Sequence, residues 1–165
     1  KLCSTNIEIQ LWPKQHFDKF LVVHVEDDFV AQQIVQKLFS SEEFRFKQYT
    51  SVGDLRDDLI TLVKLARKYQ GFFLVSDGEL RDGTFCNVFT ALEHIIRLNK
   101  SVVSVFTGKV DTSEKAKKLV AKFNDTHVIP DIVISKLDSP NAKRINSILK
   151  ETFYKKFHDV EKDIL

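Results

Sequence analysis

The sequence contains no methionine and only two cysteines among its 165 residues. The two cysteines, Cys3 and Cys86, lie far apart, without a Cys-x-x-Cys spacing or a histidine cluster. This pattern argues against a structural zinc site and against a disulfide framework, so we expect a cytoplasmic protein. Because no initiator methionine is present, we expect the chain to be processed or to be part of something longer.

The sequence also lacks long apolar runs and an excess of charge of either sign. No run approaches the roughly 18 apolar residues of a membrane span, and the first residues lack the apolar segment of a signal peptide. The 25 Lys and Arg nearly balance the 23 Asp and Glu, so no nucleic-acid contact is indicated. What is present is 43% hydrophobic residues with 14 Phe, enough to fill the core of one domain.

Strand patterns alternate with helix patterns along most of the chain. The apolar runs predict strands at 20–25, 44–50, 72–76, 102–106 and 131–134. Apolar residues at helical spacing predict helices at 29–39, 52–69, 84–98, 112–123 and from Pro140 onward. Such alternation is typical of an α/β fold, a doubly wound five-stranded parallel sheet with helices on both faces.

The ends of the chain fit this alternation less well. Residues 1–19 are expected to form an N-terminal extension, in which Ile7, Ile9 and Leu11 alternate with polar residues as in a short strand but could equally start a helix. The main domain is expected at 20–157. Residues 158–165 are expected to start a linker or to continue the last helix toward a further region.

Polar residues capable of chemistry follow four of the five predicted strands. Glu26, Asp27 and Asp28 follow the first strand, and Asp77 follows the third. The fourth strand leads into Thr107-Gly108 and the fifth into Ser135-Lys136. Because the carboxyl ends of parallel strands lie on one edge of a sheet, these residues are expected to converge there.

Converging carboxylates repel one another, by about 4 kcal/mol per pair at 4 Å and an effective dielectric constant near 20. A proton, a cation such as Lys136, or a divalent metal can offset this charge. A pocket of oxygen ligands suits Mg²⁺. A carboxylate placed beside Mg²⁺ and a lysine can attack phosphorus to form an aspartyl phosphate, and a small hydroxyl such as Thr107 can donate to a phosphoryl oxygen.

These motifs resemble the receiver domain (CheY-like) of bacterial two-component response regulators. The resemblance covers about residues 20–157 and rests on four segments in the same order: Val-Glu-Asp-Asp, Asp-x-x-Leu-x-Asp-Gly-Thr, Thr-Gly and Lys. It implies a flavodoxin-like fold and a signalling protein that catalyses only its own phosphorylation and dephosphorylation. The phosphoryl donor would be a histidine kinase or a phosphotransfer protein, and a missing output domain and a homodimer through the fourth and fifth helices are family-level expectations.

The resemblance also implies a role for each matching residue. Asp77 would be the phosphoacceptor, Thr107 the switch hydroxyl and Lys136 the contact to the phosphoryl group. Mg²⁺ would be bound directly by Asp27 and Asp77, by Glu26 through water, and by the backbone carbonyl of Glu79. The resemblance thus implies four metal-binding residues: Glu26, Asp27, Asp77 and Glu79.

Two departures from the family pattern concern the switch. Leu137 stands where such domains usually have a proline directly after the lysine, and Pro140 comes only later. Val133 occupies the position of the aromatic switch residue on the fifth strand. These changes leave the phosphoacceptor chemistry intact and bear on how a signal would be passed on.

Several other residues have a simpler interpretation. Asp28 is expected to stabilise the start of the next helix, and His24 is expected to be a hydrogen-bonded core residue. The lysines of the fourth helix form a basic face that is either solvated or faces an acidic partner: Lys115, Lys117, Lys118 and Lys122. Glu79 and Lys109 could pair across the mouth of the pocket and slow the loss of the phosphoryl group.

Two other functions compete with the phosphoacceptor. A haloacid-dehalogenase-type phosphatase needs Asp-x-Asp-Gly-Thr, and here Leu80 stands where its nucleophile should be. A receiver-like interaction module would bind partners without taking phosphate, and the two departures at Val133 and Leu137 keep this alternative open.

Overall fold

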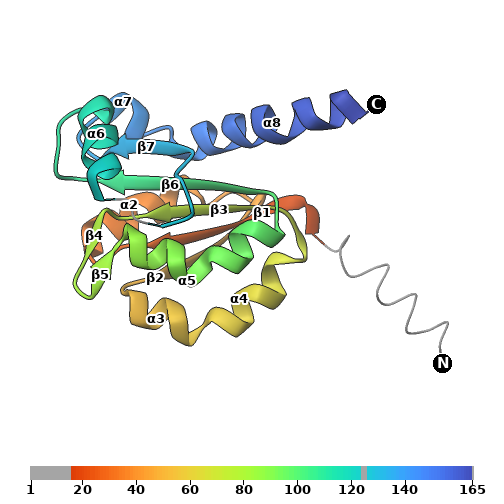
Figure 1. Cartoon of the computed structure of the whole chain (residues 1–165), viewed down its shortest axis with the longest axis horizontal. Helices are drawn as coiled ribbons and strands as arrows, with labels where there is room; N and C mark the ends of the chain where they lie inside the picture. The colour runs from red at the N-terminus through yellow and green to blue at the C-terminus, as the bar shows by residue number, and fades with distance from the viewer. Residues whose placement is uncertain (1–15, 124–125, 165) are drawn as a thin grey trace.

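The computed structural model describes residues 16–123 and 126–164 (Figure 1). The strand or helix start expected at 7–11, and Cys3, therefore lie outside the described residues. The main sheet contains β1 (His16–Val25), which comes before the first helix, and β2 (Phe44–Tyr49), which comes after it. Three more complete it: β3 (Tyr69–Ser76), β6 (Ser101–Thr107) and β7 (Ile132–Ser135).

The five strands pair in the order β2-β1-β3-β6-β7, and every pair is parallel. The predicted five-stranded parallel sheet is confirmed. Both faces of the central strands are buried, since Phe20 to Val25 and Phe72 to Val75 expose almost nothing. A continuous apolar run is what a parallel strand covered by helices on both faces requires.

Helices cover both faces of the sheet (Figure 1). On one face, α2 (Phe29–Leu38) and α8 (Ile145–Ile164) pack over Phe20, Val22 and Phe73. The opposite core, which includes Leu21, Val23 and Leu74, is covered by four helices. These are α3 (Val52–Asp57), α4 (Leu59–Ala66), α5 (Phe85–Leu98) and α6 (Ser113–Phe123). A short helix, α7 (Ser139–Ala142), precedes α8.

The predicted helix at 52–69 is wrong as a single helix, because the chain breaks at Asp58 between α3 and α4. The Asp58 carboxylate is held by β2: it accepts a hydrogen bond from Lys47 Nζ at 2.8 Å and another from the Tyr49 hydroxyl. Residue 69 already belongs to β3, where it pairs with His16 of β1. β1 itself begins at His16, so it includes residues that were expected to belong to the N-terminal extension.

Two further segments differ from the expected pattern. The loop expected at 77–83 contains a small antiparallel hairpin, formed by β4 (Glu79–Leu80) and β5 (Gly83–Thr84). The last helix is divided into α7 and α8, and α8 continues to Ile164. Among the described residues, no helix combines the length and the apolar character that a membrane crossing needs.

Candidate functional site

Three carboxylates meet at the carboxyl edge of the sheet. Glu26 and Asp27 follow β1, and Asp77 follows β3, the neighbouring strand. Backbone bonds extend the ladder past the strand ends: Glu26 N donates to Tyr49 O and Asp77 N donates to Val25 O, each at 2.9 Å. Each of the three acids offers one oxygen, and these oxygens lie within 4.8 Å of one another. The convergence predicted from the strand ends is therefore present.

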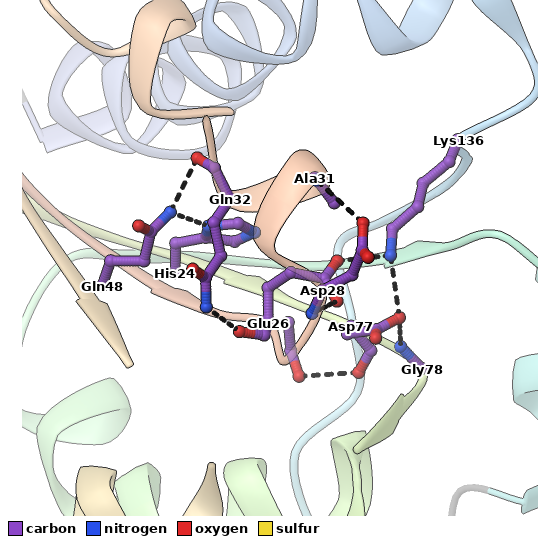
Figure 2. A network of polar contacts seen from close by, with 10 residues as sticks. His24, Glu26, Asp28, Ala31, Gln32, Gln48, Asp77, Gly78 and Lys136 are labelled. Atoms are coloured by element: carbon purple, nitrogen blue, oxygen red, sulfur yellow. Dashed lines mark hydrogen bonds and ion pairs between the residues drawn. The ribbon is translucent and has the colours of Figure 1, made fainter. Parts of the chain in front are cut away.

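Lys136 supplies the positive charge of this acidic cluster. Its Nζ atom lies 3.2 Å from Asp77 Oδ1 and also pairs with Glu26 Oε1 (Figure 2). Glu26 is 1% exposed, whereas the Lys136 side chain is 21% exposed. Backbone pairing fixes the start of this loop, since Lys136 N donates to Thr107 O at 2.8 Å. One ammonium thus faces two of the three carboxylates.

The cluster contains three carboxylates and one ammonium, and the pKa values of Glu26 and Lys136 reflect this excess of acidic groups. Burial, together with the hydrogen bond to Asp77, raises the pKa of Glu26 to about 7, although the Lys136 ammonium acts in the opposite direction. Burial also opposes the charged form of Lys136, but the Glu26 and Asp77 carboxylates outweigh it and raise the pKa of that ammonium. The cluster can therefore take up a proton or a further cation.

The oxygens of the cluster differ in how they are engaged. Glu26 Oε1 contacts Lys136, and Glu26 Oε2 accepts a hydrogen bond from Asp28 N at 3.3 Å. Asp77 Oδ1 accepts from Gly78 N at 2.8 Å as well as from Lys136. Asp27 is half-buried, and its carboxylate makes no hydrogen bond or ion pair within the described part of the chain. Mg²⁺ usually retains several bound waters and binds only one or two protein carboxylates. Three clustered carboxylates, of which Asp27 is accessible and has no partner among the described residues, fit this ion.

Thr107 ends β6 beside Asp77 and is 3% exposed. Its hydroxyl lies against Gly78, because a Cβ built on Gly78 would come 2.9 Å from Thr107 Oγ1 and 3.1 Å from Thr107 Cβ. A side chain at this position would therefore require Thr107 or the Gly78 backbone to shift. The site thus combines three acids, an ammonium and a hydroxyl from four strand ends.

No protein-family model matches the sequence, and no curated protein matches it either. Solved structures do match the fold. The receiver domain protein (CheY-like) from Methanospirillum hungatei aligns with a TM-score of 0.55 and 13% identity, over 83% of this chain and 98% of its own. The receiver domain protein from Clostridium thermocellum aligns with a TM-score of 0.56 and 12% identity, over 82% and 95% of the two chains.

A third match comes from the co-crystal structure of the Saccharomyces cerevisiae histidine phosphotransfer signaling protein Ypd1 and the receiver domain of its downstream response regulator Ssk1. It aligns with a TM-score of 0.57 and 12% identity, over 85% of this chain and 92% of the other. This chain has the CheY-like receiver fold. The fold implied by the sequence motifs is confirmed, and at these identities the likeness extends to the fold alone.

An ion pair joins two segments that follow Asp77 and Thr107 closely in sequence. Lys109, two residues after Thr107, pairs with the carboxylate of Glu79 on β4. Both side chains are largely exposed, at 51% for Lys109 and 60% for Glu79. The pairing that the sequence suggested is present. The Glu79 side chain is thus directed to Lys109, and the role of its backbone carbonyl as a metal ligand stays a prediction.

The structure also confirms the simpler roles expected for Asp28 and His24. Asp28 is the N-cap of α2, where its carboxylate accepts a hydrogen bond from Ala31 N at 2.9 Å. His24 is fully buried on β1 and is bonded through Nδ1 to Gln48 of β2. Burial, with a contribution from the Lys136 charge, lowers the pKa of His24 to about 3, so the ring is neutral.

The two residues that depart from the expected pattern lie on β7 and just after it. Leu137 is exposed after Lys136, and Val133 on β7 pairs with Val105 and packs into the core that α5 and α6 cover. The β7 end is tied to the start of α6 by other bonds. Ser135 Oγ donates to Val110 O, and Ser113 Oγ donates to Asp138 Oδ2 at 2.6 Å.

Sequence reasoning missed three residues that shape the site. Gly78 allows the Thr107 side chain to lie against the backbone, and a glycine directly after the predicted acceptor was a sequence signal for this close contact. Gln32 on α2 donates to the backbone carbonyl of Glu26, and Gln48 on β2 donates to the backbone carbonyl of Gln32 and bonds to the His24 ring. Their side chains carried no signal in the sequence, because the partners are two backbone carbonyls and the buried ring of His24.

Proposed function

We propose that this protein is a phosphoacceptor receiver in which Asp77 takes a phosphoryl group. An Asp77 carboxylate oxygen would attack the phosphorus of a phosphohistidine, the P–N bond would break, and the released imidazole would take up a proton. The product is an aspartyl phosphate, and its hydrolysis returns the free carboxylate and inorganic phosphate. The protein would be its own substrate and would have no turnover on an outside molecule.

The observation that carries this proposal is the position of Asp77 relative to Lys136. Nζ of Lys136 lies 3.2 Å from Asp77 Oδ1, so an ammonium is at hand for the charge that gathers on phosphoryl oxygens. Thr107 adds a hydroxyl that lies against Gly78, the residue after Asp77. A phosphoryl group brings close to two negative charges and three acceptor oxygens, which these two donors can bind.

Mg²⁺ fits the same arrangement. Asp27 and Asp77 would bind it directly and Glu26 through water, because both Glu26 oxygens already have partners in the protein. The backbone carbonyl of Glu79 would complete the protein ligands. When bound, the ion would neutralise the carboxylates and the phosphoryl oxygens and so favour transfer to Asp77.

The partner that supplies the phosphoryl group is proposed to be a histidine kinase or a histidine phosphotransfer protein. One solved structure of this fold contains the histidine phosphotransfer protein Ypd1 together with a receiver. The surface beside the site suits contact with a protein, since Phe29, Val30 and Leu137 are exposed apolar side chains next to Asp28 and Lys136. A homodimer through α6 and α8, an acidic partner for the basic face of α6 and a further output domain remain expectations.

The experiment is incubation with acetyl phosphate and Mg²⁺, followed by intact-mass measurement. We expect a mass gain of one phosphoryl group that is absent without Mg²⁺ and absent in Asp77→Asn. The matched control is Asp57→Asn, because Asp57 is an exposed acid at the end of α3, outside the acidic cluster. A wild-type protein that gains no mass, or an Asp77→Asn variant that gains as much, contradicts the proposal.

The second candidate is a receiver-like module that binds partners without phosphorylation. Leu137 and Val133 favour it, because both positions depart from the pattern through which receivers pass on their signal. Beryllium fluoride with Mg²⁺ separates the two functions. An unchanged protein, by thermal stability and by molecular mass in solution, would support the binding module.

A further inference from the structure

A network of amide side chains lies behind the acidic cluster (Figure 2). The Gln32 Nε2 atom donates to the backbone carbonyl of Glu26 at 2.5 Å. The Gln48 Nε2 atom donates to the backbone carbonyl of Gln32 at 2.9 Å and to His24 Nδ1 at 2.8 Å. The network therefore links β2, β1 and the first turn of α2 to the peptide that joins Glu26 and Asp27.

His24 completes the network as a fixed acceptor. An amide nitrogen only donates, so His24 Nδ1 accepts from Gln48 and the ring proton is on Nε2. That Nε2 is buried without a hydrogen-bond partner among the described residues. Both hydrogens of the Gln48 amide are thereby used, one on the ring and one on the Gln32 carbonyl, which fixes the orientation of the amide.

The network holds the backbone between the last hydrogen bond of the sheet and the first hydrogen bond of helix α2. The sheet ladder holds Glu26 through its N–H, which donates to Tyr49 O. The helix begins only at Phe29, and Gln32 N donates to Asp28 O at 2.9 Å. Between these two bonds, the carbonyl of Glu26 is held by the Gln32 side chain alone among the described contacts.

We propose that Gln32, supported by Gln48, is a positioning residue that holds the Glu26–Asp27 peptide so that both carboxylates face the Mg²⁺ site. The inference rests on the proposed magnesium site and deepens it. The two carboxylates flank a single peptide, so rotation of that peptide would turn one or both away from Asp77. Bonds that orient ligands from behind commonly change metal affinity by about 10- to 100-fold when they are removed.

The test compares Gln32→Met with Gln33→Met in the full chain. Methionine keeps the length and helix preference of glutamine and removes the amide donor. Gln33 is the adjacent residue of α2, is exposed, and its side chain makes no hydrogen bond within the described residues, so it is a matched control. The Mg²⁺ dissociation constant is measured by calorimetry with MgCl₂, and the rate of phosphorylation by acetyl phosphate is measured against Mg²⁺ concentration.

We expect Gln32→Met to raise the Mg²⁺ dissociation constant about tenfold and to keep the phosphorylation rate at saturating Mg²⁺ within about threefold of wild type. Gln33→Met should match wild type in both. A residue with only a structural role would lower the melting temperature of the metal-free protein and leave the Mg²⁺ dissociation constant unchanged. Equal Mg²⁺ affinities in all three proteins, or an equal loss in both variants, overturns the inference.

The Gln48→Met variant gives a second test, because its own Mg²⁺ affinity can also be compared directly with that of wild type. Gln48 reaches the site only through Gln32 and His24, so its loss should weaken Mg²⁺ binding less than the loss of Gln32. The double variant should bind Mg²⁺ no more weakly than Gln32→Met, because the two residues belong to one chain of bonds. Additive losses overturn the inference, whereas a wild-type protein that does not bind Mg²⁺ overturns the proposed site itself.

Discussion

The hydroxyl of Thr107 lies directly against Gly78, where a Cβ would come within 2.9 Å of Thr107 Oγ1. Gly78 does not have a positive φ angle, so alanine is acceptable to the backbone and the contact with Thr107 is the only obstacle. The residue after the candidate phosphoacceptor and the candidate switch hydroxyl are therefore packed as one unit.

Gly78→Ala is expected to lower the free energy of unfolding by about 1–3 kcal/mol, as overpacking commonly does. In a Thr107→Ala background the same substitution should cost less, because the nearest atom, Oγ1, is gone. Chemical denaturation of the two single variants and the double variant measures this coupling. Equal costs of Gly78→Ala in both backgrounds would show that the two residues are not in contact.

The pKa of Glu26 predicts how stability depends on pH in the metal-free protein. The ordinary value of 4.5 is raised to about 7 in the folded protein, chiefly by burial. Between these values the unfolded chain has lost the proton that the folded protein keeps, so this group lowers the free energy of unfolding as pH rises from about 4.5 to 7. The decrease is at most about 1.4 kcal/mol per pH unit.

Glu26→Gln removes this decrease, so the variant should gain stability relative to wild type as pH rises through that window. The comparison with wild type matters because His24 acts in the opposite sense. Its pKa is lowered to about 3, so His24 lowers stability as pH falls below 6.5 in both proteins. Urea unfolding at pH 4.5, 5.5, 6.5 and 7.5 measures the difference, and a constant difference contradicts the assignment.

The strand ends were the part of this site that could be predicted from the sequence. Glu26, Asp27, Asp77, Thr107 and Lys136 each follow a run of apolar residues, and a parallel sheet brings such positions to one edge. The hairpin of β4 and β5 could not be predicted in this way. It depends on Asp82, whose carboxylate accepts hydrogen bonds from Val52 N at 3.0 Å and Gly53 N at 2.9 Å.

The break between α3 and α4 has the same kind of cause. The apolar spacing of residues 52–69 is continuous, but Asp58 is bound to Lys47 and Tyr49 on β2. These contacts join residues that are distant in sequence, so no local pattern reports them. The network of Gln32 and Gln48 also escaped prediction, because its partners are the backbone carbonyls of Glu26 and Gln32 and a buried ring.

Mg²⁺ is expected to stabilise the protein more at pH 8 than at pH 5. Binding requires the carboxylates to be ionised, and the raised pKa of Glu26 means that protons compete with the ion below about pH 7. At a Mg²⁺ concentration 100 times the dissociation constant, the gain is about 2.7 kcal/mol. Thermal melts with and without MgCl₂ at the two pH values measure it. Asp27→Asn should lose most of the gain, and an equal gain at both pH values contradicts the proposed ligands.

The ion pair between Glu79 and Lys109 predicts a slow loss of the phosphoryl group. Glu79 and Lys109 follow Asp77 and Thr107 by two residues each, so we expect the pair to lie at the mouth of the site, where a water molecule would approach the phosphorus of phosphorylated Asp77. The Glu79→Ala, Lys109→Ala double variant should therefore lose phosphate several-fold faster than wild type, measured by intact mass over time after removal of the donor. Its stability should change little, since exposed ion pairs contribute between about 0 and 1 kcal/mol.

The matched control for this variant is the exposed pair of Asp111 and Lys115, whose charged atoms lie 3.1 Å apart. Asp111→Ala, Lys115→Ala removes the same two charge types without opening the mouth. Equal rates of phosphate loss in both double variants would assign the effect to net surface charge. A wild-type rate in Glu79→Ala, Lys109→Ala would show that the pair does not obstruct water, because nothing else in that variant replaces the two side chains at the mouth.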